Sequence, residues 1–292
     1  MNQYGGQTEF GRIKRLALKS PEAAFHNQEQ IDNEWQKLNY HSAPDFVKAV
    51  NEYQQFVMLI KTIEPEILFL DEDTSSTLDS IYCRDAALIT DRGLILANMG
   101  KPERGNEPSL LGDGLTAHGI PILGEISGAG QLEGGDVCYL NERTMAVGEG
   151  YRTNPEGIQQ LHALMGDTID ELIVVPLPHF KGPADVFHLM SIISPLDNDL
   201  AVVYSPLLSV RFRNYLLEHG FTLVEVPDEE FPRMACNILA LAPRQVLMLD
   251  GNPVTRQRLE ENGVEVMTYR GDEISRKGEG GPTCLTRPVW RE

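Results

Sequence analysis

Residues 86–97 have the sequence AALITDRGLILA, in which two β-rich apolar runs flank a polar centre. This pattern predicts a β-hairpin. It recurs three more times, in residues 137–148, 191–204 and 238–249. A pattern that returns about every 50 residues indicates a fold built from repeated units.

The segment after each hairpin repeats as well. A proline stands where each helix would begin. Proline is tolerated there because the N–H that it lacks would have no partner within the helix. The four prolines are Pro108, Pro155, Pro206 and Pro253. Before three of them stands a side chain that can cap the helix, and these are Asn154, Ser205 and Asn252. Each helix then reaches a glycine suited to a left-handed end, namely Gly119, Gly166, Gly220 or Gly263. Short apolar strands follow at 120–126, 172–178, 221–227 and 264–269, so the unit is strand, strand, helix, strand.

A fifth unit is divided between the two ends of the chain. Residues 13–18, 45–63 and 66–70 would supply a strand, a long helix and the closing strand, and residues 284–290 the missing first strand. Pairing of the two ends would close a ring and remove exposed sheet edges. We therefore predict a single domain, residues 1–292 with a flexible segment 1–9, folded as a five-fold pseudosymmetric α/β propeller of ββαβ units around a central pocket. An open α/β sheet is the alternative.

One position of the unit is polar in every copy. At the start of the five hairpins stand Asp85, Asp136, His188, Asn237 and Cys284, separated by 51, 52, 49 and 47 residues. In a ring, equivalent positions lie at equal distances from the axis, so these side chains are expected to converge. A core does not normally collect two carboxylates, an imidazole, an amide and a thiol. The sequence therefore predicts a ligand site on the axis.

Each of these residues also has a purely structural interpretation. His188 lies in an apolar stretch and could be a core histidine, and the two aspartates could cap turns. For Asn237, fixing the local backbone and taking part in the chemistry are equally acceptable. Cys284 differs from the other cysteines because it follows the glycine-rich segment 278–283, GEGGPT, which lets backbone approach a ligand.

The chemistry of this set favours a cationic substrate. A cysteine with a histidine is a pair for covalent catalysis, and the thiolate is the nucleophile. Carboxylates nearby raise the pKa of a thiol, so they suit a substrate that is itself a cation. A planar guanidinium fits best, because carboxylates bind it through paired charge-assisted hydrogen bonds.

Composition excludes several other classes of protein. Hydrophobic residues make up 41% of the chain, and the 25 basic against 43 acidic residues give a net charge of −18. Such a charge disfavours binding to nucleic acid or to an anionic membrane surface. Residues 1–10 are polar, no apolar run approaches the roughly 20 residues that cross a bilayer, and the four cysteines have no CxxC spacing. We expect a cytoplasmic protein with free thiols, and the sequence leaves a homodimer open.

Five short motifs in order resemble the pentein superfamily of guanidino-group-modifying enzymes. They are YCRD at 82–85, LEGGD at 132–136, GEGYRTN at 148–154, HL at 188–189 and GGPTC at 280–284. The chain is similar to the dimethylarginine dimethylaminohydrolase branch and to short arginine hydrolases. The resemblance implies a hydrolase without cofactor or metal that converts arginine or an N-methylated arginine to citrulline and an amine.

The resemblance also implies roles for single residues. Cys284 matches the nucleophile that forms a covalent S-alkylthiouronium, His188 the acid and base, and Glu133 the carboxylate that orients the histidine. The expected substrate-binding residues are Asp85 for the guanidinium, Arg152 for the α-carboxylate, and Asp136, Asp79 and Arg104.

Two departures from the family pattern point in opposite directions. Met190 stands two residues past the histidine, where related enzymes carry a second aspartate, and an apolar neighbour would tolerate a methylated nitrogen. Arg84, just before Asp85, instead follows the deiminase and amidinotransferase pattern. Alternatives to the hydrolase are an amidinotransferase, which would pass the amidino group to an amine, and a non-catalytic binding module on the same ring.

Overall fold

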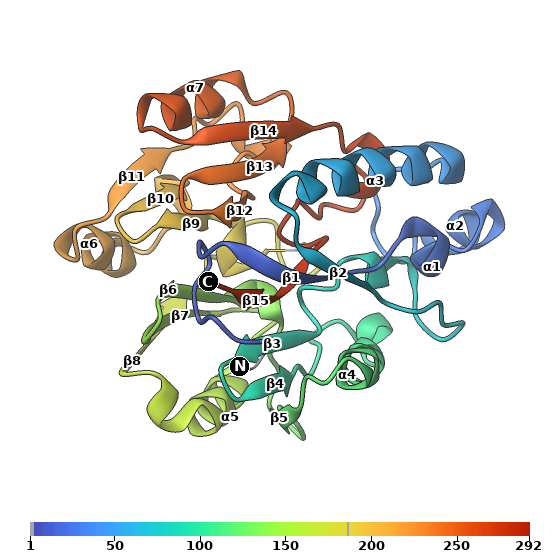
Figure 1. Cartoon of the computed structure of the whole chain (residues 1–292), viewed down its shortest axis with the longest axis horizontal. Helices are drawn as coiled ribbons and strands as arrows, with labels where there is room; N and C mark the ends of the chain where they lie inside the picture. Colours follow the sequence, from blue (N-terminus) through green and yellow to red (C-terminus); the bar gives the residue numbers. More distant parts are fainter. Residues whose placement is uncertain (1–2, 186) are drawn as a thin grey trace.

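The computed structural model describes residues 3–185 and 187–292, in which five three-stranded sheets form a ring (Figure 1). In every repeat the first strand is antiparallel to the second, and the second is parallel to the third. The helices lie at the rim of the view, so the sheets stand between the helices and the axis. The predicted five-fold α/β propeller is confirmed.

Four sheets come from four consecutive repeats. The first two are β3 (Ala87–Thr90), β4 (Gly93–Leu96) and β5 (Ile122–Glu125), then β6 (Val137–Asn141), β7 (Thr144–Glu149) and β8 (Glu171–Pro176). The other two are β9 (Ile193–Asp197), β10 (Leu200–Val203) and β11 (Thr222–Glu225), then β12 (Leu239–Ala242), β13 (Gln245–Leu249) and β14 (Glu265–Tyr269). All four predicted hairpins and the strands after them are therefore present.

The fifth sheet is made from both ends of the chain, as predicted. It has the order β15 (Arg287–Arg291), β1 (Ile13–Leu18) and β2 (Glu66–Phe69). The C-terminus lies near the middle of the ring in Figure 1. The β15–β1 pairing closes the ring and gives β1 a hydrogen-bonded neighbour on each side.

A helix joins the second and third strands of each repeat. These are α4 (Glu107–Ala117), α5 (Pro155–Met165), α6 (Val210–Glu218) and α7 (Pro253–Glu261), while α1 (Pro21–Ala24), α2 (Gln28–Glu34) and α3 (Phe46–Ile60) lie between β1 and β2. Each of α4 to α7 is followed by the expected glycine with positive φ: 80° at Gly119, 54° at Gly166, 84° at Gly220 and 75° at Gly263.

The predicted helix starts are only partly correct. The Asn154 side chain accepts a hydrogen bond from the Gly157 N–H at 2.9 Å and caps α5 as expected. Pro206 instead lies in a 3₁₀ turn, and α6 begins at Val210 with Ser209 as its cap.

The other two expected caps have different roles. Ser205 donates its hydroxyl to Glu225 at 2.6 Å. Asn252 donates to nearby carbonyl groups, and the N-terminus of α7 is capped from outside by the carboxylate of Glu230. At α7 the expected cap is replaced because a distant side chain can supply the same acceptor, and at α6 because the helix begins four residues later than predicted.

Residues 3–9, which we expected to be flexible, instead pack against the ring. Gly5 forms a bridge with Trp290, and Gln7 and Glu9 are buried. The Gln7 side chain donates to the Glu142 carbonyl at 2.9 Å. This segment fills the space beside β15, which a pattern of local elements does not predict.

Apolar clusters fill the spaces between neighbouring sheets and under the helices. One joins α3 to β12, β13 and β1, and another joins β9 and β10 to β12 and β13. Within the described ranges no helix has the length and apolar character needed to traverse a lipid bilayer. Polar side chains lie near the axis. They come from the loops that precede the first strand of each sheet.

Candidate active site

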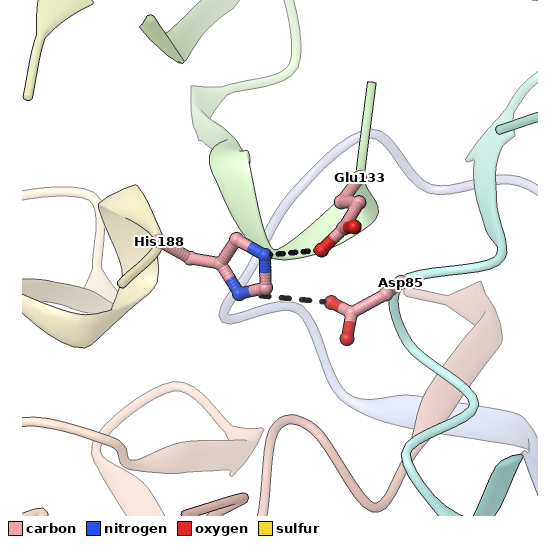
Figure 2. A group of neighbouring side chains, drawn as sticks. All are labelled: Asp85, Glu133 and His188. Atoms are coloured by element: carbon pink, nitrogen blue, oxygen red, sulfur yellow. Dashed lines mark hydrogen bonds and ion pairs between the residues drawn. The ribbon is translucent and has the colours of Figure 1, made fainter. Parts of the chain in front are cut away.

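His188 lies between two buried carboxylates (Figure 2). Its Nε2 is 2.7 Å from Glu133 Oε2, and its Nδ1 is 3.9 Å from Asp85 Oδ1. Burial alone lowers the pKa of His188, but Asp85, Asp136 and Glu133 raise it above its ordinary value. The imidazole is therefore a cation at neutral pH that can donate a proton.

Glu133 remains a carboxylate in this pair. Burial alone would raise its pKa, but the hydrogen bond and charge of His188, together with the charge of Arg152, hold it below the ordinary value. Glu133 Oε1 also accepts from the backbone N–H groups of Gly100 and Lys101 at 3.0 and 3.2 Å. The side chain that orients His188 is thus itself held in place.

Gly135 explains why the EGGD segment needs a glycine. A Cβ atom there would lie 2.5 Å from His188 Nδ1 and 2.8 Å from Asp85 Oδ1. Both distances are too short for non-bonded atoms, so any side chain would push the histidine or the aspartate out of position. The glycine lets one turn of backbone pack against both groups.

Asp136, which we expected to bind the substrate, lines neither of the two cavities beside Cys284. It is fully buried, its Oδ1 accepts from the Leu189 N–H at 3.0 Å, and its Oδ2 accepts from the Thr153 hydroxyl at 2.7 Å. Burial raises its pKa to about 6, although His188 acts in the opposite direction. Asp136 therefore fixes the backbone next to His188, while Glu133, three residues earlier, takes the contact with the imidazole.

Cys284 is partly exposed and lines the same two cavities as His188. Its Sγ accepts from the Asn237 side-chain amide at 3.3 Å, and the Asn237 oxygen accepts from the Thr283 N–H and hydroxyl. Burial raises the pKa of the Cys284 thiol above its ordinary value, and the charge of Asp85 raises it further. Asn237 thus holds both the thiol and the loop that carries it.

The first cavity beside Cys284 is lined by charged groups and has a volume of about 30 Å³. Arg152 lines it and lies 3.4 Å from Glu133 Oε1. Asp79 also lines it, but its carboxylate pairs with Lys101 at 2.5 Å. One oxygen, Asp85 Oδ1, is buried and has no hydrogen-bond partner among the described residues. It is an acceptor that a cationic ligand could use.

Arg104 lies at this cavity, but its guanidinium is already occupied. It donates to Asp85 Oδ2 at 2.7 Å, to the Tyr82 carbonyl at 2.9 Å and to both oxygens of Glu107. Burial raises the pKa of Glu107 to about 7 against the effect of Arg104. Arg104 therefore holds Asp85, and a contact of Arg104 with the substrate stays a prediction.

The second cavity beside Cys284 is larger and has a cluster of apolar side chains on its wall, although Lys181, Asp185 and Glu279 line it too. Its volume is about 120 Å³, and it adjoins the charged cavity at Cys284, His188 and Glu279. Aromatic and aliphatic side chains form much of its wall: Phe180, Phe187, Phe231, Pro232 and Met234. Cys284 and His188 therefore stand between a charged and an apolar compartment.

Several residues of the site carried no signal in the sequence pattern. Lys101, Glu107 and Thr153 stand outside the repeated position and gain their roles only through the partners described above. Lys101 and Glu107 do lie three residues on either side of Arg104, so the charge density of residues 101–107 was the available clue.

The two residues that gave conflicting substrate signals both point away from the site. Met190 is buried in the apolar cluster around β9 and β10 and lines neither cavity beside Cys284. Arg84 pairs with Glu9 at 2.9 Å in a separate cavity. Neither side chain can select a substrate by contact, which removes both arguments.

Asp85, Glu133 and His188 are also a group that could hold a metal ion. They offer one ligand atom each within 4.8 Å of one another. In the structure the imidazole bridges the two carboxylates (Figure 2), which is also the arrangement of a histidine used as acid and base. All four cysteines are free, as expected.

Comparison with known proteins gives consistent matches along the chain. A family model described as N,N dimethylarginine dimethylhydrolase, eukaryotic, matches residues 20–291. The N(G),N(G)-dimethylarginine dimethylaminohydrolase of Pseudomonas aeruginosa is 26% identical over 244 residues, covering 83% of this chain and 89% of that one. An arginine deiminase of Mycobacterium avium is 28% identical, covering 73% of this chain and 60% of that one.

Solved structures agree at the level of the fold. A mutant of the Pseudomonas aeruginosa enzyme in complex with citrulline matches with a TM-score of 0.77 at 23% identity, covering 94% of this chain and 98% of that one. The N-terminal domain of ArgZ, a cyanobacterial arginine dihydrolase, matches with a TM-score of 0.79 at 20% identity, covering 96% and 98%. The chain belongs to the N,N dimethylarginine dimethylhydrolase family, within the pentein superfamily.

Proposed function

We propose that the chain is a hydrolase that cleaves a C–N bond of arginine or an N-methylated arginine to give citrulline and ammonia or an amine. The observation that carries the proposal is Asp85 Oδ1, a buried carboxylate oxygen at the cavity beside Cys284 that accepts no hydrogen bond from the described residues and has His188 Nδ1 3.9 Å away. A guanidinium N–H would satisfy it and bring the guanidinium carbon to the thiol. The dimethylarginine enzyme and arginine deiminase among the relatives act on this class of compound by name.

A bound guanidinium would lower the pKa of the Cys284 thiol. Since burial and Asp85 both raise the pKa of Cys284, the thiol is protonated at neutral pH in the free protein. A guanidinium beside it would offset the charge of Asp85 and favour the thiolate. Substrate binding therefore releases the thiol proton at the place where attack occurs.

The reaction then takes two steps. The thiolate of Cys284 bonds to the guanidinium carbon, the C–N bond breaks, and the leaving amine takes a proton from His188. The neutral imidazole next removes a proton from water, whose oxygen bonds to the same carbon. The C–S bond breaks and returns the thiolate, and the remaining proton on the oxygen passes to the released amine or ammonia through solvent, which leaves the C=O of citrulline. Glu133 orients His188 throughout through the 2.7 Å contact.

The two compartments suggest how the substrate lies. Arg152 can bind the α-carboxylate in the charged cavity, and Asp79 can take the α-amino group while remaining paired with Lys101. The apolar cavity on the other side of Cys284 suits a methylated nitrogen better than a bare one. We therefore propose that N-methylated arginines are better substrates than arginine.

Product analysis tests this function. The purified protein is incubated with arginine, monomethylarginine, asymmetric dimethylarginine, agmatine and guanidino acids, and citrulline and amine are measured. We expect citrulline and methylamines in equal amounts, unchanged by EDTA because no step uses a metal. Cys284→Ser and Asp85→Asn should abolish turnover, while Asp113→Asn, at an exposed aspartate, should not.

Other outcomes would contradict the proposal. Product that appears only when glycine or lysine is added would identify an amidinotransferase. No turnover of any guanidine, with alkylation of Cys284 unaffected by these compounds, would indicate a binding module instead.

A further inference from the structure

A second polar cavity lies near the axis, separate from the active site. It has a volume of about 20 Å³ and shares no lining residue with the two cavities beside Cys284. Its wall comes from the N-terminal segment, from β15, and from side chains of β3 and β6: Gly5, Glu9, Arg84, Ile89, Tyr139 and Arg287. Arg291 also lines it and reaches the Ala240 carbonyl of β12, so four of the five sheets meet here.

The charges around this cavity do not balance. Three guanidinium groups, of Arg84, Arg287 and Arg291, surround one carboxylate, that of Glu9. All four residues are buried, with exposed fractions of 2%, 5%, 6% and 8%. Among the residues that line the cavity this leaves an excess of two positive charges, which Asp85, a further carboxylate that acts on Arg287, offsets only in part.

The hydrogen bonds show where the excess lies. Arg84 donates to Glu9 at 2.9 Å, and Arg291 donates to the carbonyls of Gly11 and Ala240 at 2.6 and 2.9 Å. Arg287 has two donors, Nε and Nη2, without a hydrogen-bond partner among the described residues, and the Nε of Arg84 is a third. Two N–H donors of a buried cation at this cavity point to a missing acceptor.

The electrostatic environment agrees with this geometry. Burial, together with the charge of Arg84, lowers the pKa of Arg287 to about 9, and burial lowers that of Arg291 to about 10. Both groups are still protonated at neutral pH, so the excess charge is present under ordinary conditions. An anion would compensate this positive charge and accept hydrogen bonds. A water molecule would accept hydrogen bonds but would not compensate the charge.

The size of the cavity restricts the anion. A volume of about 20 Å³ is close to the space of one water-sized sphere, which is roughly 10–15 Å³. A single-atom ion fits this space, whereas phosphate, sulfate or a substrate carboxylate with its side chain does not. We infer that this cavity binds one chloride ion, held by Arg287 and the neighbouring Arg84 and Arg291 beside Glu9.

The ion would have a structural consequence for the chain ends. The Gly5 N–H donates to the Val289 carbonyl, and the Gly5 carbonyl accepts from the Arg291 N–H. Arg12 and Glu292 exchange two backbone hydrogen bonds. Arg287 and Arg291 lie at the two ends of β15 in the same sheet. Chloride would therefore tie the N-terminal segment to the strand that closes the ring.

Bromide replacement tests the site directly. Crystals of the full chain are grown with sodium bromide in place of sodium chloride, and anomalous difference maps are calculated at the bromine edge. We expect a peak in contact with Arg287 Nε or Nη2. Density there without anomalous signal would identify water and overturn the inference.

Thermal unfolding provides a second test in solution. In sodium chloride the Tm should rise by about 2–4 °C in a saturable manner relative to sodium gluconate at equal ionic strength. Arg287→Gln should lose this difference, and the matched control Arg211→Gln, at an exposed arginine, should keep it. Equal Tm values in the two salts, or an unchanged response in Arg287→Gln, would contradict chloride binding.

Glu9→Gln distinguishes a bound anion from a general salt effect. It removes the one carboxylate of the cluster, so chloride dependence of the Tm should become larger than in the natural protein. A smaller or equal dependence would contradict the inference. If Arg287→Gln does not fold, the bromide peak in the natural protein and the response of Glu9→Gln still decide the question.

Discussion

Asp85 combines a structural and a chemical task through its two oxygens. Oδ2 accepts from Arg104 at 2.7 Å, and Oδ1 accepts no hydrogen bond from any described residue. Arg104 is in turn held by Glu107, so the free oxygen is fixed in direction by a chain of buried ion pairs. A substrate contact prepared in this way needs little reorganisation when the ligand arrives.

The protonation of Cys284 gives a prediction at the scale of one residue. Burial and Asp85 raise the pKa of this thiol, so its alkylation by iodoacetamide should reach half its maximal rate above the ~8.5 of free cysteine. Asp85→Asn removes a negative charge, and the alkylation profile should move toward lower pH. Mass spectrometry identifies the modified site, since Cys83, Cys138 and Cys236 are buried. A profile at or below that of free cysteine would contradict the assignment.

His188 and Cys284 together set the expected pH dependence of turnover. The pKa of both groups is raised, and the reaction needs thiol proton loss with the imidazole proton kept. Therefore kcat/KM should rise with pH as the thiol ionises more easily and fall once pH passes the raised pKa of His188. Steady-state kinetics from pH 5 to 11 would show a bell with an alkaline optimum. A maximum on the acidic side of neutrality would contradict these protonation states of Cys284 and His188.

Gly135 provides a steric prediction. Gly135→Ala would place a Cβ 2.5 Å from His188 Nδ1, and a displacement of the imidazole should lower kcat by about 10²-fold. The control is Gly114→Ala in α4, where the nearest atom is a flexible Leu70 methyl at 3.3 Å. Kinetics and thermal unfolding of both variants check the prediction. Normal activity of Gly135→Ala would show that the turn can move away from the histidine.

At the scale of the elements, the repeat is carried by strands and helix ends. Every predicted hairpin formed, because alternating apolar runs around a turn are a local signal. Helix starts were less regular, since the cap of α6 is local and that of α7 comes from Glu230 in another segment. The helices therefore occupy equivalent positions in the repeats, whereas the side chains that cap them differ from one repeat to the next.

The cap of α7 can be tested by its effect on stability. Glu230 is buried and accepts from the Val254 and Thr255 N–H groups at 2.8 Å and from the Thr255 hydroxyl at 2.6 Å. Glu230→Ala would leave these donors without an acceptor and should lower the free energy of unfolding by about 1–3 kcal/mol. Urea denaturation would measure the change. Glu229→Ala, at the exposed neighbouring residue, should be close to neutral, and equal effects would refute the capping role.

At the scale of the whole molecule, the ring depends on pairing between segments almost 280 residues apart. Ile13 lies opposite Arg291 and Ala17 opposite Arg287. Because both chain ends lie in this sheet, we expect the ring to close also when the chain ends are moved to a loop of another repeat. The active site on the axis needs contributions from loops of several sheets at once.

Circular permutation tests this expectation. Joining the ends by a Gly/Ser linker of about ten residues and opening the chain between His219 and Gly220, both exposed, should preserve the circular dichroism spectrum and turnover. Opening it instead between the buried residues Leu247 and Met248 of β13 should prevent folding. Loss of structure in the first permutant would mean that the order of the repeats contributes to ring closure.

The sequence by itself determined the repeat and the residues nearest the axis. Spacing along the chain fixes how far a residue lies from the axis of a ring, so Asp85, His188 and Cys284 could be predicted to converge. It could not show where side chains point, because direction depends on packing between sheets. Only the tertiary structure decided that Asp136 holds backbone, that Arg104 holds Asp85, and that Arg84 turns toward Glu9. Only the tertiary structure showed, too, that residues 3–9 pack against the ring, because their contacts are with the opposite end of the chain.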